Sequence, residues 1–599
     1  MKNNKILLLT LLCPLLLTSC RSYFDLLPQE DSGPEIGPNN TYKVDVFNVI
    51  KATKNRMNIV STPSYRDVYS KSIYVKFYDE EHLVPYLTLD DFLSIENSLL
   101  DSGKGNIVKT STSLTYSVTY GGELYFSFID DYDKGVFNIA GDLSSLAMSS
   151  NVASDSSLKL GYTYIRSDYY QEDENFYKEY SYKNAGFVVH EESGTRYYPL
   201  SLLSLAFNDL TYISFFYNYD DIYVTDDFEY FKEEFRYSRS YQTINPYADF
   251  YNIAYKTTNQ MSDAVKQDRL SSYLFFLQNM YGLKSTWGWS DEDMDEFLDS
   301  FNFKEDMLSD NALTRQKALT NLSNNLDDAH TGVDASPWEK GQKYTGDRGP
   351  RIQHMIESGS NINAVRRKAN LKAINYSTDG STALFVLDEF MNITSNYRNK
   401  TASQLAKDDD FFYVAETLKT IKNKGGVKNV IIDITMNGGG YVSAMLKILA
   451  LLSSNNNAEA AFYTETTDTY EIDGMMVDSN LDGKYDADDV YGDDFNFYIM
   501  PSYYSFSCGN AFPFLAQKYN YATIIGEESG GGECVVIPLL MPTGEEVSHS
   551  SHTHIGYYDD QNDKWYGNEF GPVVEEKYRI DSDDINRYNM NYLQRVISK

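Results

Sequence analysis

The sequence is poor in cysteine and in basic residues. Its 599 residues include 4 cysteines, and only Cys508 and Cys534 lie beyond the first twenty positions, so disulfides do not organise this protein. Lys and Arg number 52 against 86 Asp and Glu, which gives a formal net charge of −34 at pH 7. Nucleic acid and anionic membrane surfaces repel such a chain, so we expect no nucleic-acid partner. Acidic side chains instead attract cations, which makes Ca²⁺ a candidate ligand.

Long apolar runs are absent beyond the N-terminus, so the sequence predicts no internal membrane span. Residues 1–20 are organised as a signal peptide: Lys2 and Lys5 precede the apolar stretch 6–17, and Leu17-Thr-Ser-Cys20 follows. This tetrapeptide resembles a bacterial lipobox, which implies that Cys20 is lipidated. The alternatives are an ordinary secretory signal or a short membrane anchor, but the stretch is short for a span. We expect a lipid-anchored protein on the extracytoplasmic face of the cell membrane.

Composition divides the remaining chain into regions. Residues 21–40 are rich in Pro, Gly, Asn and acids, as expected of a tether. Residues 41–260 alternate Tyr, Val, Thr and Phe with polar residues, which predicts a β-rich region of one or two domains. Residues 261–345 show helical spacing, and strands alternate with helices over 346–599, which predicts an α/β unit. The 52 tyrosines are compatible with a sugar- or peptide-binding surface, but Tyr also favours strands.

Local signals mark some element ends. Gly121-Gly122 between two alternating runs predicts a β-hairpin. Asp90 and Ser290 are predicted to cap helices, because each precedes a segment with helical spacing.

A glycine turn is the first motif with chemical content. Residues 428–434 have a buried-strand pattern, Asn437-Gly-Gly-Gly440 follows, and a helix is predicted to open at Tyr441. Free backbone N–H groups at a helix start bind an anion, either a phosphate or the oxyanion of acyl transfer. The glycine spacing is neither that of a dinucleotide loop nor that of a P-loop, so phosphate is the weaker interpretation. Tight packing alone would also explain three glycines.

A serine follows the next predicted strand. The strand covers 495–500, and Ser507 lies in Ser505-Phe-Ser-Cys-Gly-Asn510 just before a helix. A serine nucleophile needs this exposure and the neighbouring N–H donors, although a serine before a helix is more commonly an N-cap. Because parallel strands end along one sheet edge, we expect Gly439 and Ser507 to meet.

The two turns and Gly526-Glu527 together resemble the C-terminal-processing and tricorn-type serine peptidases, over roughly residues 310–580. The resemblance implies a C-terminal α/β domain of ClpP/crotonase-like fold that hydrolyses peptide bonds in peptides or proteins as an endopeptidase, without an organic cofactor. It implies that Ser507 is the nucleophile and that the backbone N–H groups of Gly439 and Cys508 form the oxyanion hole. Cys508 itself is expected to pack behind the turn, and a disulfide with Cys534 is left open.

The general base distinguishes two branches of this family. The processing-protease branch has a lysine 25 residues after the serine, and 507 + 25 = 532 is a glycine here. The tricorn-like branch takes a histidine from the helical segment before the α/β domain, where His330 stands. An imidazole titrates near neutrality, which suits a base for Ser507. The alternative for His330 is a core position that continues the leucine stripe of the preceding helix.

The acid behind the base is less well defined. Glu569 resembles the late acidic residue of the tricorn-like branch, and Asp327 and Asp328 are local competitors. Asn510 stands where the family usually has an acid, and Thr435 where it usually has arginine. These departures support a second interpretation, a catalytically impaired homologue that binds peptides or cell-wall polymers.

An acidic loop precedes the nucleophile strand. It matches an EF-hand-type calcium loop with Asp at position 12, as in dockerin-like loops, and a solvated acidic turn is the alternative. We expect a structural Ca²⁺ with the ligand set Asp478, Asn480, Asp482, Lys484, Asp486 and Asp489.

Three histidines lie close together near the C-terminus, in the strand-like segment that carries His549, His552 and His554. No acidic or cysteine partner accompanies them at metal-ligand spacing. We therefore favour a polar strand near the substrate cleft over a metal site.

Overall fold

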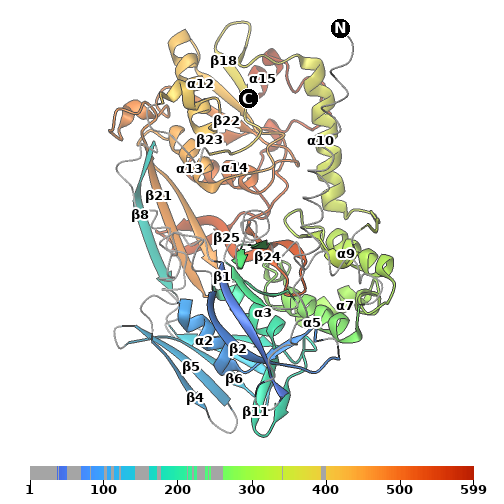
Figure 1. The fold of residues 1–599 in the computed structure, drawn as a ribbon. Helices are drawn as coiled ribbons and strands as arrows, with labels where there is room; N and C mark the ends of the chain where they lie inside the picture. Colours follow the sequence, from blue (N-terminus) through green and yellow to red (C-terminus); the bar gives the residue numbers. More distant parts are fainter. Residues whose placement is uncertain are drawn as a thin grey trace, which may run out of the picture.

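The computed structural model describes residues 37, 40–49, 69–80, 82–99, 104–109, 113–120, 123–141, 161–171, 177–211, 214–218, 221–225, 237–239, 242–244, 261–339, 341–392 and 400–598. The signal peptide, Cys20 and most of the tether lie outside these residues. The protein is multidomain, with a β-rich N-terminal region and a mixed α/β C-terminal region (Figure 1), as the sequence predicts. Among the described residues, no helix combines the length and the apolarity that a bilayer crossing requires.

The N-terminal region is built on two large sheets. One has the strand order β10-β11-β3-β2-β1-β13-β12, the other the order β4-β5-β6-β7-β9, and β14 pairs with β15. The strands are β1 (Tyr42–Val49), β2 (Tyr69–Phe77), β3 (Pro85–Leu87), β4 (Lys104–Lys109), β5 (Ser113–Tyr120), β6 (Glu123–Asp131), β7 (Val136–Gly141), β9 (Tyr177–Ser181), β10 (His190–Glu192), β11 (Thr195–Pro199), β12 (Ser214–Tyr217), β13 (Ile222–Thr225), β14 (Tyr237–Arg239) and β15 (Gln242–Ile244). The helices are α2 (Leu89–Leu99) and α3 (Leu200–Thr211).

Two local predictions in this region had different outcomes. β5 and β6 form the predicted hairpin, in which Tyr120 is paired with Glu123. The Asp90 cap was wrong, because α2 already begins at Leu89. Thr88 is the capping residue: the Asp91 N–H donates to Thr88 Oγ1 (3.1 Å), and Thr88 Oγ1 donates to the Asp91 carboxylate (2.7 Å).

The helical segment shares its core with the N-terminal region. Its elements are α5 (Asp263–Asn279), α6 (Leu283–Thr286), α7 (Asp291–Asp299), α8 (Phe303–Met307), α9 (Ala312–Leu326), β16 (Gly332–Ala335) and the 3₁₀ helix η3 (Pro337–Glu339). Ser290 caps α7 in a capping box with Asp293, which confirms that prediction. One apolar cluster joins these helices to the N-terminal strands and to Cys534, Leu539, Met541 and Val547 of the C-terminal region.

A second seven-stranded sheet contains strands from all parts of the chain. Its order is β16-β25-β20-β21-β8, and β24 and β26 also pair with β25. Besides β16, its strands are β8 (Tyr162–Gln171), β20 (Ala458–Thr464), β21 (Thr469–Val477), β24 (Cys534–Leu540), β25 (Glu546–Asp559) and β26 (Lys564–Gly567). Figure 1 shows β8, from the β-rich region, beside β21 of the C-terminal region. Nothing in the residues of either strand indicated this long-range pairing.

The predicted α/β unit is a five-stranded sheet of order β17-β18-β19-β22-β23, parallel from β18 onward. Successive residues of β19 face opposite sides: Val430 and Ile432 pack with α12, α13 and α14, and Ile431 packs with α15. The strands are β17 (Asn375–Tyr376), β18 (Thr382–Val386), β19 (Asn429–Asp433), β22 (Asn496–Met500) and β23 (Ala522–Ile524). The helices of this region are α10 (Pro350–Ala369), α11 (Ala402–Leu405), α12 (Asp410–Lys424), α13 (Val442–Leu451), η4 (Ala487–Asp489), α14 (Cys508–Lys518), η5 (Glu576–Tyr578) and α15 (Met590–Ile597).

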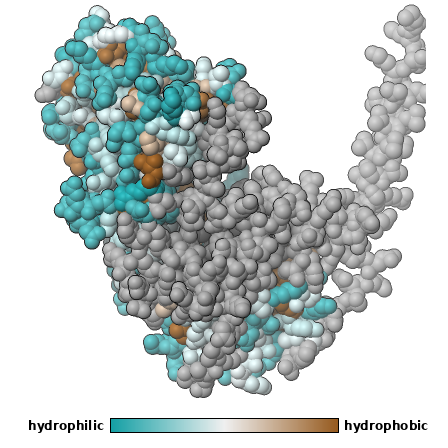
Figure 2. All heavy atoms as spheres, turned by 90° about the vertical axis from the view of Figure 1, so that its left-hand side faces the viewer, coloured by the Kyte–Doolittle hydropathy of each residue, from teal (hydrophilic) through white to brown (hydrophobic). Residues whose placement is uncertain are grey.

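The described surface on the side of α12 and α13 is mainly hydrophilic (Figure 2). This agrees with the net charge of −34, because a strongly charged chain keeps its polar side chains in water.

Four charged side chains are buried where the helical segment meets the second seven-stranded sheet. Arg269 of α5 binds Glu339 and Glu545, and Arg315 of α9 also binds Glu339. None of the four is more than 4% exposed. Burial alone would raise the pKa of Glu339, but the arginines hold it below its usual value. The cluster is formally neutral, which is the condition under which buried charges are tolerated.

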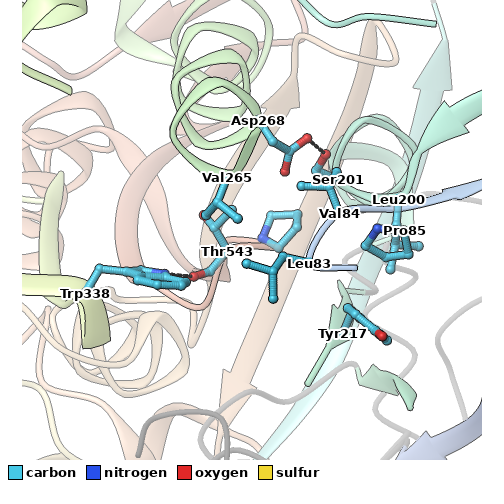
Figure 3. A pocket seen from close by; sticks show the side chains of 11 residues that line it. Leu83, Val84, Pro85, Leu200, Ser201, Tyr217, Val265, Asp268, Trp338 and Thr543 are labelled. Atoms are coloured by element: carbon cyan, nitrogen blue, oxygen red, sulfur yellow. Dashed lines mark hydrogen bonds between the residues drawn. The ribbon is translucent and has the colours of Figure 1, made fainter. Parts of the chain in front are cut away.

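A small cavity of about 30 Å³ adjoins this cluster (Figure 3). It is lined by Leu83 and Leu200 of the N-terminal region and by Trp338, whose Nε1 donates to the Thr543 carbonyl (2.9 Å). Ser201 hydrogen-bonds Asp268 on the cavity wall, and burial raises the pKa of Asp268 to about 7. A space of this size holds a water molecule or two, so we regard it as a packing feature.

Replacing Glu545 by Gln should unfold the junction more easily, because Arg269 then loses one of its two buried counter-charges. We expect a loss of about 3 to 5 kcal/mol in the free energy of unfolding, measured by urea denaturation. Glu575, which is exposed and pairs with Lys577, supplies the control: Glu575→Gln should change stability by less than about 1 kcal/mol. Equal stability of both variants would contradict the importance of the cluster.

Candidate active site

Ser507 occupies a strained turn between β22 and α14. Its backbone has φ +57° and ψ −125°, a region that residues with a side chain rarely adopt. Its N–H donates to the Gly531 carbonyl (2.9 Å), and its carbonyl accepts the Ala511 N–H (2.9 Å). The half-buried side chain makes no capping hydrogen bond to the helix. Ser507 is therefore at the N-cap position, but its Oγ is not used as a cap.

Gly439 lies directly against Ser507. β19 and β22 are parallel neighbours, with Asp433 opposite Met500, so both turns leave the same edge of the sheet. The Phe506 N–H donates to the Asn437 carbonyl (3.1 Å) and links the turns. A Cβ on residue 439, where φ is +112°, would lie 2.8 Å from Ser507 Cβ, so only glycine fits.

The predicted oxyanion donors differ in their present partners. The Gly439 N–H donates to Asn437 Oδ1 (2.9 Å), so an oxyanion would have to share or displace that bond. Cys508 is the first residue of α14, a position whose N–H has no partner within the helix. Its Sγ donates to the Gly440 carbonyl (3.2 Å), and burial raises its thiol pKa to about 12, which disfavours a thiolate mechanism. Cys534 is also free, so the two cysteines form no disulfide.

His330 lies beside the residue that precedes the nucleophile. Its ring contacts the Phe506 ring edge-on, with 4.6 Å between centroids. The side chain is 8% exposed, and Nδ1 is buried with no hydrogen-bond partner in the described part of the chain. Burial lowers the pKa of His330. The Asp328 carboxylate opposes this shift, and the Arg351 guanidinium adds to it. The neutral imidazole, the form that acts as a base, is therefore favoured near pH 7.

The predicted acid Glu569 is bound elsewhere. Its carboxylate contacts Arg351 and accepts the N–H groups of Gly532 (3.0 Å) and Glu533 (2.9 Å). Burial raises the pKa of Glu569, and Arg351 opposes the shift. Among the described contacts, Glu569 makes no hydrogen bond to His330. The expectation that it orients the base is not supported, because its partners are Arg351 of α10 and the backbone of the loop behind Ser507.

The two local acids have distinct roles. Asp327 accepts the backbone N–H groups of Arg351 (2.7 Å) and Ile352 (2.9 Å), so it caps α10. Asp328, 2% exposed, accepts the backbone N–H of His330 (3.0 Å) and the hydroxyl of Thr331 (2.6 Å). Asp328 is thus the acid that holds the turn carrying His330.

Arg366 was missed by the sequence analysis. It reaches from α10 to Asp433 (2.9 Å) and Thr435 Oγ1 (3.2 Å), and it binds Asp388 through Nη1. A guanidinium therefore lies beside Thr435, the position at which the related peptidases usually have arginine. No signal near residue 366 indicated this, because its hydrogen-bond partners, which include Tyr588, are 22 to 222 residues away.

Asn510 is buried and fully engaged. Its Nδ2 donates to the Asn568 carbonyl (2.7 Å), and its Oδ1 accepts the Ser529 hydroxyl (2.6 Å). A carboxylate cannot donate, so aspartate at this position would lose the bond to Asn568. The amide thereby ties α14 to the segment that carries Glu569.

The predicted calcium loop is closed by hydrogen bonds to its own backbone. Asp478 accepts the N–H groups of Asp482 (3.0 Å) and Gly483 (2.8 Å), and Asp489 accepts that of Ser479 (2.8 Å). These bonds bring loop positions 1, 5 and 6 together, but in the described residues no three His, Cys, Asp or Glu side chains are placed to hold a metal. Calcium binding stays a prediction.

The three histidines of β25 have different surroundings. His549 packs against the Phe276 ring, with 5.1 Å between centroids. His552 and His554 turn toward carboxylates: His552 Nδ1 lies 3.2 Å from Glu465, and His554 Nδ1 lies 2.9 Å from Glu533.

A serine whose hydroxyl does not cap the following helix, on a strained strand-to-helix turn beside a glycine turn, is the arrangement of a serine hydrolase. The model of peptidase family S41 matches residues 403–568. This match to the model of peptidase family S41 supports a serine peptidase in the C-terminal part of the chain. The matched segment contains Gly439 and Ser507 but begins after His330 and ends one residue before Glu569.

Several solved structures resemble part of this chain. Mature CPAF in complex with lactacystin is 12% identical, with 57% of this chain and 98% of that chain covered and a TM-score of 0.36. A lipoprotein from Streptococcus agalactiae is 11% identical, with coverages of 56% and 96% and a TM-score of 0.32. The photosystem II D1 C-terminal processing protease is 13% identical, with coverages of 38% and 53% and a TM-score of 0.26. No curated protein matches. Since all three TM-scores lie below 0.5, the assignment rests on the family match.

Proposed function

We propose that the protein hydrolyses peptide bonds as an endopeptidase, through an acyl-enzyme on Ser507 with His330 as general base. The observation that supports the proposal is the Ser507 hydroxyl, which is not used as a helix cap and lies against the glycine turn, one residue after the Phe506 ring that His330 contacts. Phe506, which contacts the His330 ring, is the residue directly before the nucleophile.

The proposed reaction has two halves. Ser507 Oγ attacks the carbonyl carbon while its proton passes to His330 Nε2, which then gives the proton to the leaving amine. Nδ1 is buried away from solvent, so Nε2 is the nitrogen assigned to proton transfer. A water molecule then attacks the acyl-enzyme, His330 takes its proton, and the carboxylic acid product leaves as Ser507 regains its proton. The Cys508 N–H, and the Gly439 N–H once released from Asn437, are assigned to the oxyanion.

A second candidate function is peptide or cell-wall-polymer binding by an impaired homologue. Two observations favour it: the Gly439 N–H is already bonded to Asn437, and His330 Nδ1 has no acceptor among the residues that the structure describes. A base without an acceptor for its second nitrogen is less well oriented than one in a triad.

A fluorophosphonate probe distinguishes the two functions. The wild-type protein should be labelled, Ser507→Ala should not be, and His330→Ala should be labelled at least about 100-fold more slowly, because the base is lost. His190→Ala, in the N-terminal region, is the matched control and should keep the wild-type rate. Labelling is read by intact-protein mass spectrometry.

The pH dependence of the same labelling tests the base. Since burial lowers the pKa of His330, the neutral form persists to lower pH, and half-maximal labelling should fall below the usual histidine value of about 6.5. Labelling of Ser507→Ala at the wild-type rate would contradict the peptidase mechanism. A wild-type protein that resists the probe would favour the binding function.

We also propose that Cys20 carries a lipid that anchors the protein on the extracytoplasmic face of the cell membrane. The motif over residues 17–20 supports this. Cys20→Ser should move the protein from the membrane pellet to the soluble fraction and abolish incorporation of a labelled fatty acid. Unchanged recovery in the pellet would contradict lipid anchoring.

The acidic loop is proposed to bind Ca²⁺ as a structural ion. Calcium at 100 times its dissociation constant should raise the free energy of unfolding by about 2.7 kcal/mol, measured by thermal unfolding with magnesium as comparator. Asp482→Asn should weaken this effect, because it removes charge from a ligand position. Asp488→Asn, in the same loop at position 11, should retain it. The absence of any calcium effect on the wild-type protein would rule the ion out.

A further inference from the structure

Behind Ser507, two buried glutamates each accept hydrogen bonds from the backbone around the other. Glu533 Oε2 accepts the N–H groups of Asn568 (2.8 Å) and Glu569 (2.9 Å). In return, Glu569 Oε2 accepts the N–H groups of Gly532 (3.0 Å) and Glu533 (2.9 Å). Glu533 is 6% exposed and Glu569 is 4% exposed. We call this reciprocal arrangement of Glu533, Glu569 and the four N–H groups the carboxylate clamp.

The clamp acts on the loop that supports Ser507. The Gly531 carbonyl accepts the Ser507 N–H (2.9 Å), and the Gly530 N–H donates to the Ser505 carbonyl (2.7 Å). The loop of residues 529–533 and the turn that carries Ser507 are therefore hydrogen-bonded to each other on both sides of Phe506. Because Ser507 sits at an unfavourable φ of +57°, its conformation depends on such neighbours.

Each carboxylate of the clamp has a side-chain partner of its own. Arg351 contacts Glu569, and His554 Nδ1 lies 2.9 Å from Glu533 Oε1. Thr286 Oγ1 also donates to Glu533 Oε1 (3.2 Å). Burial would raise the pKa of Glu533, but the contacts with His554, the backbone and Thr286 keep it below the usual value.

Two further titratable groups lie close to His554 in the described part of the chain. Glu465 lies 3.9 Å from Nε2 of His554, the nitrogen that does not face Glu533. The Cys534 thiol lies 3.7 Å from Nδ1, the nitrogen that does. The Cys534 thiol stays protonated because burial raises its pKa strongly.

We propose that Glu533, with His554 as its partner, is a positioning residue for Ser507. It holds the loop of residues 529–533 in the place where Gly531 receives the Ser507 N–H. Glu569 acts on the same loop and belongs to the nucleophile side of the site. The inference rests on the proposed role of Ser507 as nucleophile.

The first test replaces Glu533 by Gln, which keeps an acceptor oxygen but removes the charge. The rate of fluorophosphonate labelling should fall about tenfold across the pH range, because the charge-assisted bonds to the backbone weaken. Glu465→Gln is the matched control: it faces the same histidine, does not touch the loop, and should label within twofold of the wild-type rate.

The second test is a pH profile that a purely structural role would not shift. In His554→Asn, Glu533 loses its partner, and the pKa of Glu533 rises. The acid limb of the labelling profile should therefore move up by about one pH unit. The labelling rate at pH 8 should stay within twofold of the wild-type rate. His549→Asn, on the same strand but packed on Phe276, should keep the wild-type profile. Wild-type rates for Glu533→Gln together with an unshifted His554→Asn profile would overturn the proposal.

Hydrogen exchange separates this proposal from the proposed function. In Glu533→Gln, peptides that cover residues 500–515 should exchange faster than in the wild type, because the acceptor of the Ser507 N–H is less firmly held. Glu465→Gln should leave them unchanged. Faster exchange in a protein that the probe does not label would refute the peptidase mechanism and leave the clamp standing. Unchanged exchange in Glu533→Gln would refute the clamp.

Discussion

The buried cluster of Arg269, Arg315, Glu339 and Glu545 is the interaction on which the arrangement of the site depends. It joins α5 and α9 to η3 and to the turn between β24 and β25. His330 lies between α9 and η3 in the chain, so its place relative to the sheets follows from this junction. Such a cluster is tolerated only when every charge has its partner, because one missing partner leaves an uncompensated charge in the interior.

Helix α10 carries this constraint from the base to the sheet that bears the nucleophile. At its start, Asp327 caps it beside the His330 turn; near its end, Arg366 binds Asp433 at the carboxyl end of β19. The same helix supplies Arg351, which reaches Glu569 and the Gly530 carbonyl. Figure 1 shows α10 along one side of the molecule, between α9 and the five-stranded sheet. One helix thus contacts the base turn, the nucleophile loop and the glycine-turn strand.

The sequence predicted the site best where the controlling contacts are local. The apolar run of β19, the glycine turn and the serine turn each depend on residues a few positions apart, and all three occur as predicted. The Ser290 cap was correct for the same reason. The Asp90 cap failed because Thr88, two residues earlier, satisfies the same helix end with a reciprocal bond to Asp91. Here the error was local: several side chains in one turn are able to cap.

The sequence by itself determined the class of chemistry: a serine at a strand-to-helix turn beside a glycine turn, within an acidic chain. Only the tertiary structure decided which charges meet. It placed Arg366 beside Thr435, paired Glu569 with Arg351 and the loop behind Ser507, and joined β8 to β21 across about 300 residues. The physical reason is that local motifs are set by backbone geometry over a few residues. The partner of a buried charge is set by the packing of the whole molecule, which must leave none of them unpaired.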